Sequence, residues 1–300
     1  MTEKNKHFDK KAYDDLHSQD PKNRGCISRH GSGATYNENN RCSYRWQAYK
    51  QAEKDKVIYD GHPDHVDYKK FPVGGKGTTF YMQNTINNIS KGGGFTNLTG
   101  KSNISEITKG KRKGQQKETF EVEVKNFQTG SVPYPNNAHH VLPNGALRQA
   151  ITEAVKLVLG EPNEEVEWAI KVKLIEKKYN LNDQSNMIIL ALTGPKACLI
   201  GLPAHLKTKK HRDHNIYSKD LQTLATRRIK NNYKQDKKKH PTDDEIGKMK
   251  DALVKLSEFF YGILTMASSR QFIFKECAIK NTADNRRQLV SLDNTLRRLV

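Results

Sequence analysis

Apolar side chains recur at helical spacing along much of the second half of the chain, and this periodicity predicts most of its helices. Gly160 follows the first of these segments, and three acidic residues open the last one, as helix ends favour. A shorter helical pattern lies near the N-terminus, where two aromatic residues and an alanine share one face. The predicted helices cover residues 44–59, 146–160, 166–179, 221–233 and 241–263.

Other apolar runs predict strands. Phe120–Lys125 alternates apolar and charged residues, which indicates a strand with one face in water. Met187–Leu190 and Cys198–Pro203 are apolar and flank a Gly-Pro turn, so we expect them to pair as a hairpin. With the helices, these strands predict an α+β fold. Residues 1 to about 130 show few apolar periodicities, and most of that region has no predicted fold.

Charge narrows the class of partner. The chain of 300 residues carries a net charge of +19, with a pI near 9.6. Such a surplus favours nucleic acid, an anionic membrane or an acidic protein, and we place nucleic acid first. Twelve basic and three acidic residues lie between His205 and His240, which is nearly half of the surplus. A solvated helix face usually mixes both signs, so this asymmetry favours contact with phosphates.

The composition also argues against several classes of protein. The four cysteines form no Cys-x-x-Cys pair, so neither a zinc ribbon nor a redox motif is predicted, and scattered thiols suit a reducing cytosol. The first residues lack the apolar segment of a signal peptide. No apolar run approaches the ~20 residues of a membrane span. We therefore expect no membrane span, and export only by a route without a cleaved signal.

The candidate chemistry centres on Asn137–Pro143, where two adjacent histidines precede a short apolar run and a proline. Neighbouring side chains of a strand point to opposite sides, so His139 and His140 can serve one site only if the chain bends there. Pro135 and Pro143 supply such bends. A surface histidine pair in a loop is the alternative interpretation.

Further candidate residues follow downstream. Asn186 stands immediately before the apolar run that begins at residue 187. His205 follows a second apolar run, and it is followed in turn by His211, His214 and Tyr217. His211 and His214 are three residues apart, which would place both on one face of a helix.

Taken together, residues 132 to about 228 resemble the AHH family of the HNH/endonuclease-VII nuclease superfamily. The resemblance rests on Ala138–Pro143, on Asn186 before an apolar strand, and on the segment from Leu202 to Leu221 with its histidines and tyrosine. It implies a ββα-metal (His-Me finger) core, which here would carry a helical insert and C-terminal helices.

The resemblance implies catalytic roles for two residues. His140 would be the general base, and a neutral imidazole suits that task near neutral pH. Asn186 would pin the connecting loop and hold the base in its working orientation. Basic side chains near His205, His211 and His214 would hold the flanking phosphates without reading bases. These are Lys207, Lys209, Lys210 and Arg212.

The resemblance also implies a metal site. His139 would be one ligand and His214 a second, while the third is either His211 or His205. The His-x-x-x-His spacing of the family is absent, because His211 and His214 are one residue too close. The cofactor would be one divalent ion, with Mg²⁺ as the first candidate and Mn²⁺, Ni²⁺ or Zn²⁺ as alternatives.

Nucleases that resemble this chain are often toxins of bacterial competition. We therefore expect a DNA endonuclease of low sequence specificity that is made in the bacterial cytoplasm and delivered into a target cell, for instance by type VI secretion. An acidic immunity protein would neutralise it. Residues 1–130 would serve trafficking, residues 131–240 would form the nuclease domain, and residues 241–300 would form a helical tail or contact a secretion adaptor.

Three alternatives remain open. The protein could be an RNase, because a metal finger does not by itself select the sugar. It could bind nucleic acid without catalysis, with histidines that hold structural zinc. It could also be an adaptor of a secretion machine that binds acidic partners, which we rank last because it leaves the histidine clusters without a role.

Overall fold

The computed structural model describes residues 25–30, 33, 35–59, 79–81, 119–121, 124–130, 136–192, 197, 200–205, 215–233 and 240–266. The chain divides into two compact units. The first contains Met1–Ala48, His139–Ile188 and Asp213–Gly262, and the second contains Tyr49–Ala138, Ile189–Arg212 and Ile263–Val300. Each unit combines stretches that are distant in sequence, and the boundaries expected at residues 130 and 240 stay predictions.

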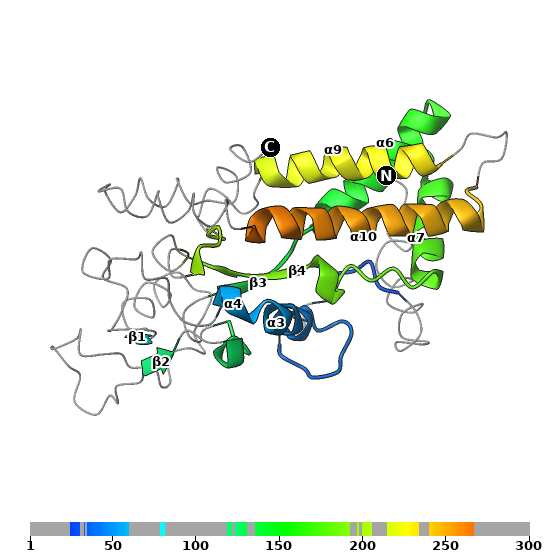
Figure 1. Cartoon of the computed structure of the whole chain (residues 1–300). Coiled ribbons are helices and arrows are strands. Elements are labelled where there is room, and N and C mark those ends of the chain that lie inside the picture. The colour runs from blue at the N-terminus through cyan, green and yellow to red at the C-terminus, as the bar shows by residue number, and fades with distance from the viewer. Residues whose placement is uncertain are drawn as a thin grey trace, which may run out of the picture. The chain divides into compact units, whose positions relative to one another are not determined.

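Four helices dominate the first unit (Figure 1). They are α6 (Asn144–Leu159), α7 (Glu164–Glu176), α9 (Asn215–Asn232) and α10 (Asp243–Thr265), the last of which runs three residues past the boundary of the unit. α6 packs against both α7 and α9. The helices predicted from periodicity are thus confirmed. Gly160 ends α6 in the left-handed conformation, with φ of 82°, which a glycine adopts without steric strain.

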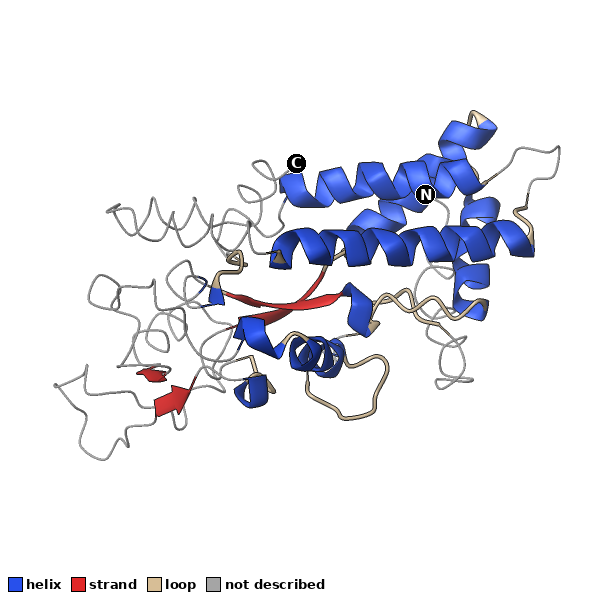
Figure 2. Cartoon of the chain, viewed as in Figure 1, coloured by secondary structure: helices blue, strands red, loops and turns tan. Residues whose placement is uncertain are grey.

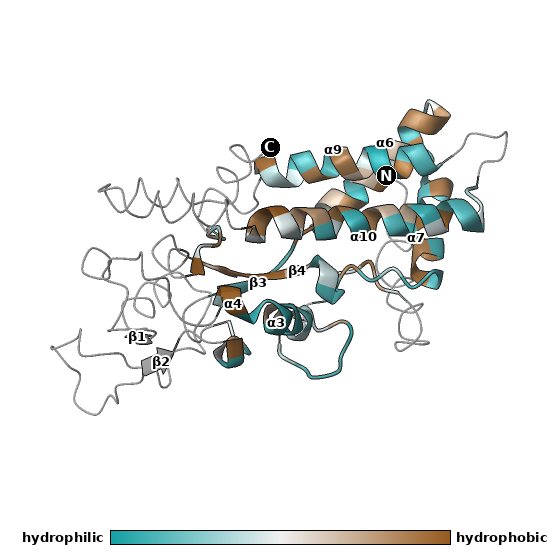
Figure 3. Cartoon of the chain, viewed as in Figure 1, coloured by the Kyte–Doolittle hydropathy of each residue, from teal (hydrophilic) through white to brown (hydrophobic). Residues whose placement is uncertain are grey.

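In α6 and α10, most of the apolar positions that predict the helix are the positions that it buries. In α6, Leu147, Ile151 and Val155 are fully buried. In α10, a stripe of apolar residues is also buried, and apolar positions recur along the helix in Figure 3. The stripe consists of Met249, Leu253, Leu256, Phe260 and Ile263. Phe260 of α10 meets Tyr217 of α9 edge to face, with ring centroids 6.3 Å apart. The C-terminal helix therefore packs on the first unit, and burial of its apolar stripe holds it there.

Ion pairs fasten the start of α10 to the end of α7. The Nζ atoms of Lys173 and Lys177 each lie 3.0 Å from a carboxylate oxygen of Asp243. Lys173 Nζ also donates to the carbonyl oxygen of Pro241 at 3.0 Å. These groups are partly exposed, so the contacts fix the position of the helix more than they stabilise the fold.

A two-stranded sheet joins β3 (Asn136–His140) and β4 (Met187–Ala191), shown in red in Figure 2. The hairpin predicted for residues 187–203 is therefore wrong. Residues 197 and 200 are helical, and the Gly201 N–H donates to the Ala197 carbonyl oxygen at 2.9 Å, a helical spacing. A short run that is buried on every side lacks the periodicity that separates a strand from a helical turn.

The second unit contains a short antiparallel pair, β1 (Thr79–Tyr81) with β2 (Thr119–Glu121), and the 3₁₀ helix η3 (Val124–Asn126). The strand predicted for residues 120–125 therefore begins as β2, but residues 124–126 form η3 instead.

The helix predicted for residues 44–59 is present as α3 (Tyr44–Lys54) and α4 (Lys56–Tyr59). Within the second unit, the Tyr59 hydroxyl both donates to the carbonyl oxygen and accepts from the N–H of Ile189, at 3.3 Å each. Among the described residues, no helix has the length and apolar character needed to cross a membrane.

Candidate functional site

The histidine pair ends β3, and the turn that follows is held by one asparagine. Asn186 Oδ1 accepts from the Leu142 N–H at 2.7 Å, while its Nδ2 donates to the carbonyl oxygens of Leu142 at 3.1 Å and Leu181 at 2.8 Å. The Asn186 carbonyl oxygen also accepts from the Val141 N–H at 2.8 Å. These bonds fix the chain that leaves the histidines.

The two imidazoles have different surroundings within the first unit. The ring of His139 lies 5.9 Å from the ring of Tyr217, on α9. The ring of His140 lies 5.3 Å from the ring of Tyr44, at the start of α3. Both histidines are largely buried, at 8% and 6% exposed. Adjacent side chains of one strand thus enter separate environments, as the alternation of a strand requires.

Tyr217 fixes the backbone beside the pair. Its hydroxyl donates to the carbonyl oxygen of Val141 at 2.6 Å, and its side chain is fully buried. The tyrosine that lies three residues beyond His214 therefore packs beneath the turn and satisfies one of its buried acceptors.

His140 is held by Asn182, a residue that sequence reasoning did not select. His140 Nε2 lies 2.9 Å from Asn182 Oδ1, and Asn182 Nδ2 donates to the carbonyl oxygen of Ser28 at 3.0 Å. A carbonyl oxygen can only accept, so the amide nitrogen faces Ser28 and the amide oxygen faces His140. His140 Nε2 must then donate, and Nδ1 of the neutral ring carries the lone pair.

Electrostatics keep this imidazole neutral. Burial lowers the pKa of His140 to about 4, the hydrogen bond that its ring donates to Asn182 opposes that shift, and the charge of Arg29 adds to it. Arg29 is exposed, and its guanidinium carbon lies 5.4 Å from the centroid of the Tyr44 ring. A cation and an aromatic ring thus lie near the buried histidine.

The remaining predicted site residues are located as follows. His205 lies in the second unit, where its N–H donates to the Ala191 carbonyl oxygen at 2.7 Å and its Nε2 lies 3.3 Å from Asn137 Nδ2. The other two predicted ligands and the four predicted phosphate contacts lie outside the described residues. These are His211, His214, Lys207, Lys209, Lys210 and Arg212.

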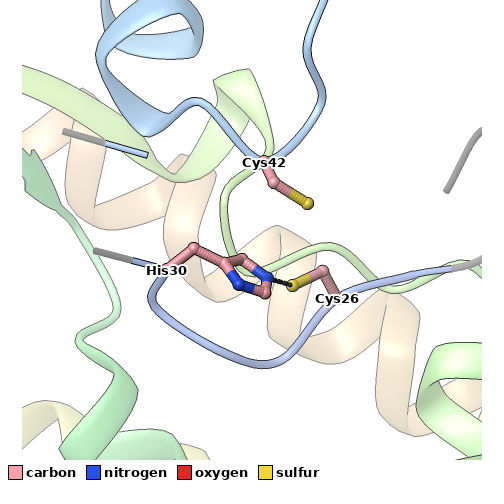
Figure 4. A group of neighbouring side chains, drawn as sticks. All are labelled: Cys26, His30 and Cys42. Carbon is pink, nitrogen blue, oxygen red and sulfur yellow. Dashed lines mark hydrogen bonds between the residues drawn. The ribbon is translucent and has the colours of Figure 1, made fainter. Parts of the chain in front are cut away.

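Another group in the first unit could hold a metal ion. Cys26, His30 and Cys42 bring two sulfur atoms and an imidazole nitrogen within 4.8 Å of one another (Figure 4). The hydrogen bond between the sulfurs, together with burial, raises the pKa of the Cys26 thiol, and the same bond lowers the pKa of Cys42. No sequence pattern indicated this cluster, because the chain contains no Cys-x-x-Cys pair. Cys26 and His30 are four residues apart in a loop, and Cys42 is more distant in sequence.

Comparison with known proteins gives the class of the site. Residues 120–253 match the sequence model of a nuclease family, which indicates a nuclease and hence a nucleic-acid substrate. The family is AHH, a nuclease family of the HNH/ENDO VII superfamily with conserved AHH, and the matched region includes Ala138-His139-His140. The resemblance inferred from the sequence is therefore confirmed. No curated protein and no solved structure matches the chain.

Proposed function

We propose that the protein is a metal-dependent endonuclease that hydrolyses DNA with little sequence specificity, and that His140 is its general base. The observation that carries this proposal is the hydrogen bond at 2.9 Å between His140 Nε2 and Asn182 Oδ1. It commits one ring nitrogen to a donor role, so the other nitrogen is the proton acceptor.

The reaction needs one proton transfer to this residue. As the oxygen of a water bonds to phosphorus, its proton passes to Nδ1 of His140, and the bond from phosphorus to the 3′ oxygen breaks. Asn182 holds the ring by its other nitrogen while Nδ1 gains the proton, and the resulting imidazolium keeps its bond to Asn182 Oδ1. Asn186 fixes the following turn, so the imidazole cannot move away with its backbone.

His139 fits the role of a metal ligand, because it brings an imidazole to the end of β3 and imidazole is a donor that first-row divalent ions accept. His214, with His211 or His205, would complete the set. A bound ion would stabilise the negative charge that develops on the leaving oxygen. Mg²⁺ is the first ion to test, and the nitrogen ligands make Mn²⁺, Ni²⁺ and Zn²⁺ necessary alternatives.

Low sequence specificity is supported by charge. The net charge of +19 favours binding to any phosphate backbone, and contacts with phosphates carry no sequence information. Arg29 is exposed next to Tyr44, and Lys207, Lys209, Lys210 and Arg212 lie between His205 and His214 in the sequence. The same positive charge would suit an acidic immunity protein. We propose that the protein acts as an antibacterial effector, which is delivered to a target cell by a type VI-like route.

Nicking of supercoiled plasmid by the purified full chain tests the proposal. We expect no cutting in EDTA, recovery with at least one of Mg²⁺, Mn²⁺, Ni²⁺ and Zn²⁺, and loss of cutting in His140→Ala. The matched control is His240→Ala, because His240 is an exposed histidine that pairs with Glu165 at 3.2 Å. Equal cutting by both variants would refute the assignment of the base. If the plasmid is retarded but stays uncut with every ion, and RNA is cleaved instead, the substrate is RNA rather than DNA.

A further inference from the structure

We propose that Cys26, His30 and Cys42 form a zinc site, separate from the catalytic ion, that holds the loop on which the orientation of His140 depends. Figure 4 shows Cys26 and His30 on one loop and Cys42 on a second segment of the chain. Cys26 Sγ and His30 Nε2 are 3.1 Å apart, and all three ligand atoms lie within 4.8 Å of one another.

The chemistry of these donors favours zinc. Two thiolates and one imidazole are a frequent zinc ligand set, whereas Mg²⁺ and Ca²⁺ require oxygen. Zinc binds sulfur at about 2.3 Å and nitrogen at about 2.0–2.1 Å, so tetrahedral ligand atoms lie roughly 3.6 Å apart. The three groups already approach this spacing and need only small movements to bind an ion. The fourth position would be filled by water or by a group outside the described residues.

One side-chain contact of Cys26 suits a metal-bound thiolate. Asn182 Nδ2 lies 3.5 Å from Cys26 Sγ, so an amide N–H points at the sulfur. Such outer hydrogen bonds commonly stabilise the ligands of a metal site. The backbone of Cys26 is held as well, because its N–H donates to the Tyr179 carbonyl oxygen at 2.8 Å and its carbonyl oxygen accepts from the Leu181 N–H at 2.6 Å.

The same contacts connect the zinc site to His140. Asn182 Nδ2 approaches both Cys26 Sγ and the carbonyl oxygen of Ser28, while Asn182 Oδ1 binds His140. Ser28 lies between Cys26 and His30 in the loop, so an ion that joins these ligands to Cys42 fixes the Ser28 carbonyl group. That group determines which way the Asn182 amide faces, and hence which nitrogen of His140 carries the proton.

A disulfide between Cys26 and Cys42 is the competing use of the two thiols. It would join the same segments but would leave His30 without a role in the cluster, although its ring nitrogen lies 3.1 Å from Cys26 Sγ. Zinc uses all three groups. The two possibilities differ in metal content and in the mass of the alkylated protein.

The test is the metal content of the purified full chain after dialysis against EDTA, with reconstitution by Co²⁺. We expect about one tightly bound zinc per chain, and on Co²⁺ substitution a thiolate-to-cobalt charge-transfer band in the near ultraviolet. Cys26→Ser and Cys42→Ser should lose both signals, whereas Cys277→Ser and His139→Ala should keep them. The wild-type cobalt spectrum needs no variant, so the test survives misfolding of the cysteine variants.

Several outcomes would overturn the inference. The first is that the wild type has neither bound zinc nor the thiolate band. The second is that Cys26→Ser binds as much zinc as the wild type. The third is a disulfide between Cys26 and Cys42, found by mass spectrometry of the non-reduced protein. The zinc site does not depend on the proposed nuclease, and only its effect on His140 does. Zinc without metal-stimulated nicking would retain the zinc site and reject the nuclease, while nicking without thiolate-bound zinc would do the opposite.

Discussion

The two neighbours His139 and His140 are one residue apart, yet the structure surrounds them with different kinds of partner. His139 lies against the ring of Tyr217, whose hydroxyl fixes the backbone at Val141, just after the histidine pair. His140 lies against Tyr44 and bonds to the fully buried Asn182. The side of His139 is built by a long helix, whereas the side of His140 is built by the start of α3 and by two loops from distant stretches of the chain.

This difference shows how one dipeptide can supply two chemical functions. Alternation along β3 separates the side chains, and each environment then selects one property. On the side of His140, burial and a fixed amide select a neutral ring with a defined tautomer. On the side of His139, the ring lies against the aromatic ring of Tyr217 at the end of β3, and an imidazole is a donor that divalent metal ions accept.

The largest effect should come from removing either of the two imidazoles, because the two variants lose different functions. We expect His140→Ala to lower the maximal nicking rate by about 10²–10⁴-fold at every metal concentration, because it removes the base. His139→Ala should instead raise the metal concentration needed for half-maximal nicking, because it removes a ligand. Metal titrations of both variants measure the difference. If both variants responded to the metal in the same way, the division of roles between the neighbours would be wrong.

Sequence reasoning was most successful where burial follows a period. The stripes of α6 and α10 are buried as predicted, because a helix that packs on one face must repeat its apolar side chains at that spacing. The failure at residues 198–203 has the converse cause. A run that is apolar at every position has no hydrophobic periodicity. The helical hydrogen bond from Gly201 to Ala197 therefore lies in a stretch that looks like a strand in the sequence.

In the candidate site, the His pair and Asn186 could be found from the order of motifs, but the partners of His140 could not. Asn182 lies in a polar loop with several similar residues, and only the fold selects it to face the ring. Ser28 and Tyr44 reach the site from a region with little periodicity, and Ser28 contributes only a backbone carbonyl group. Such contacts depend on tertiary placement, which no local pattern records.

A smaller loss is expected when the support of the base is removed and the base is kept. Asn182→Leu should lower kcat by about 10–100-fold with little change in KM, because the ring loses its fixed orientation while the phosphate contacts remain. Single-turnover cleavage at saturating enzyme measures this split. The matched control is Asn163→Leu, since Asn163 caps α7 by accepting from the Val166 N–H. Equal losses in the two variants would attribute the effect of Asn182 to stability alone.

On the side of His139, the support should act more on stability than on chemistry. Tyr217→Phe leaves the buried Val141 carbonyl oxygen without its hydroxyl donor, which should lower the free energy of unfolding by about 1–3 kcal/mol. Tyr179→Phe is the control, because the buried Tyr179 hydroxyl has no hydrogen-bond partner among the described residues. Urea unfolding monitored by circular dichroism should show a loss in the first variant and none in the second. A similar loss in both would mean that ring packing dominates.

The smallest effect should come from the exposed cation beside Tyr44. Arg29→Gln removes one charge near His140, so we expect weaker DNA binding by a few-fold and a salt dependence whose log–log slope falls by about 1, with kcat nearly unchanged. Lys156→Gln on α6 is the control for loss of an exposed charge elsewhere. Binding to a short duplex, measured by fluorescence anisotropy at several salt concentrations, separates the two variants. If Arg29→Gln changes kcat and leaves the salt slope intact, Arg29 acts on His140 rather than on phosphate, and the side of His140 would then contain a second positioning residue besides Asn182.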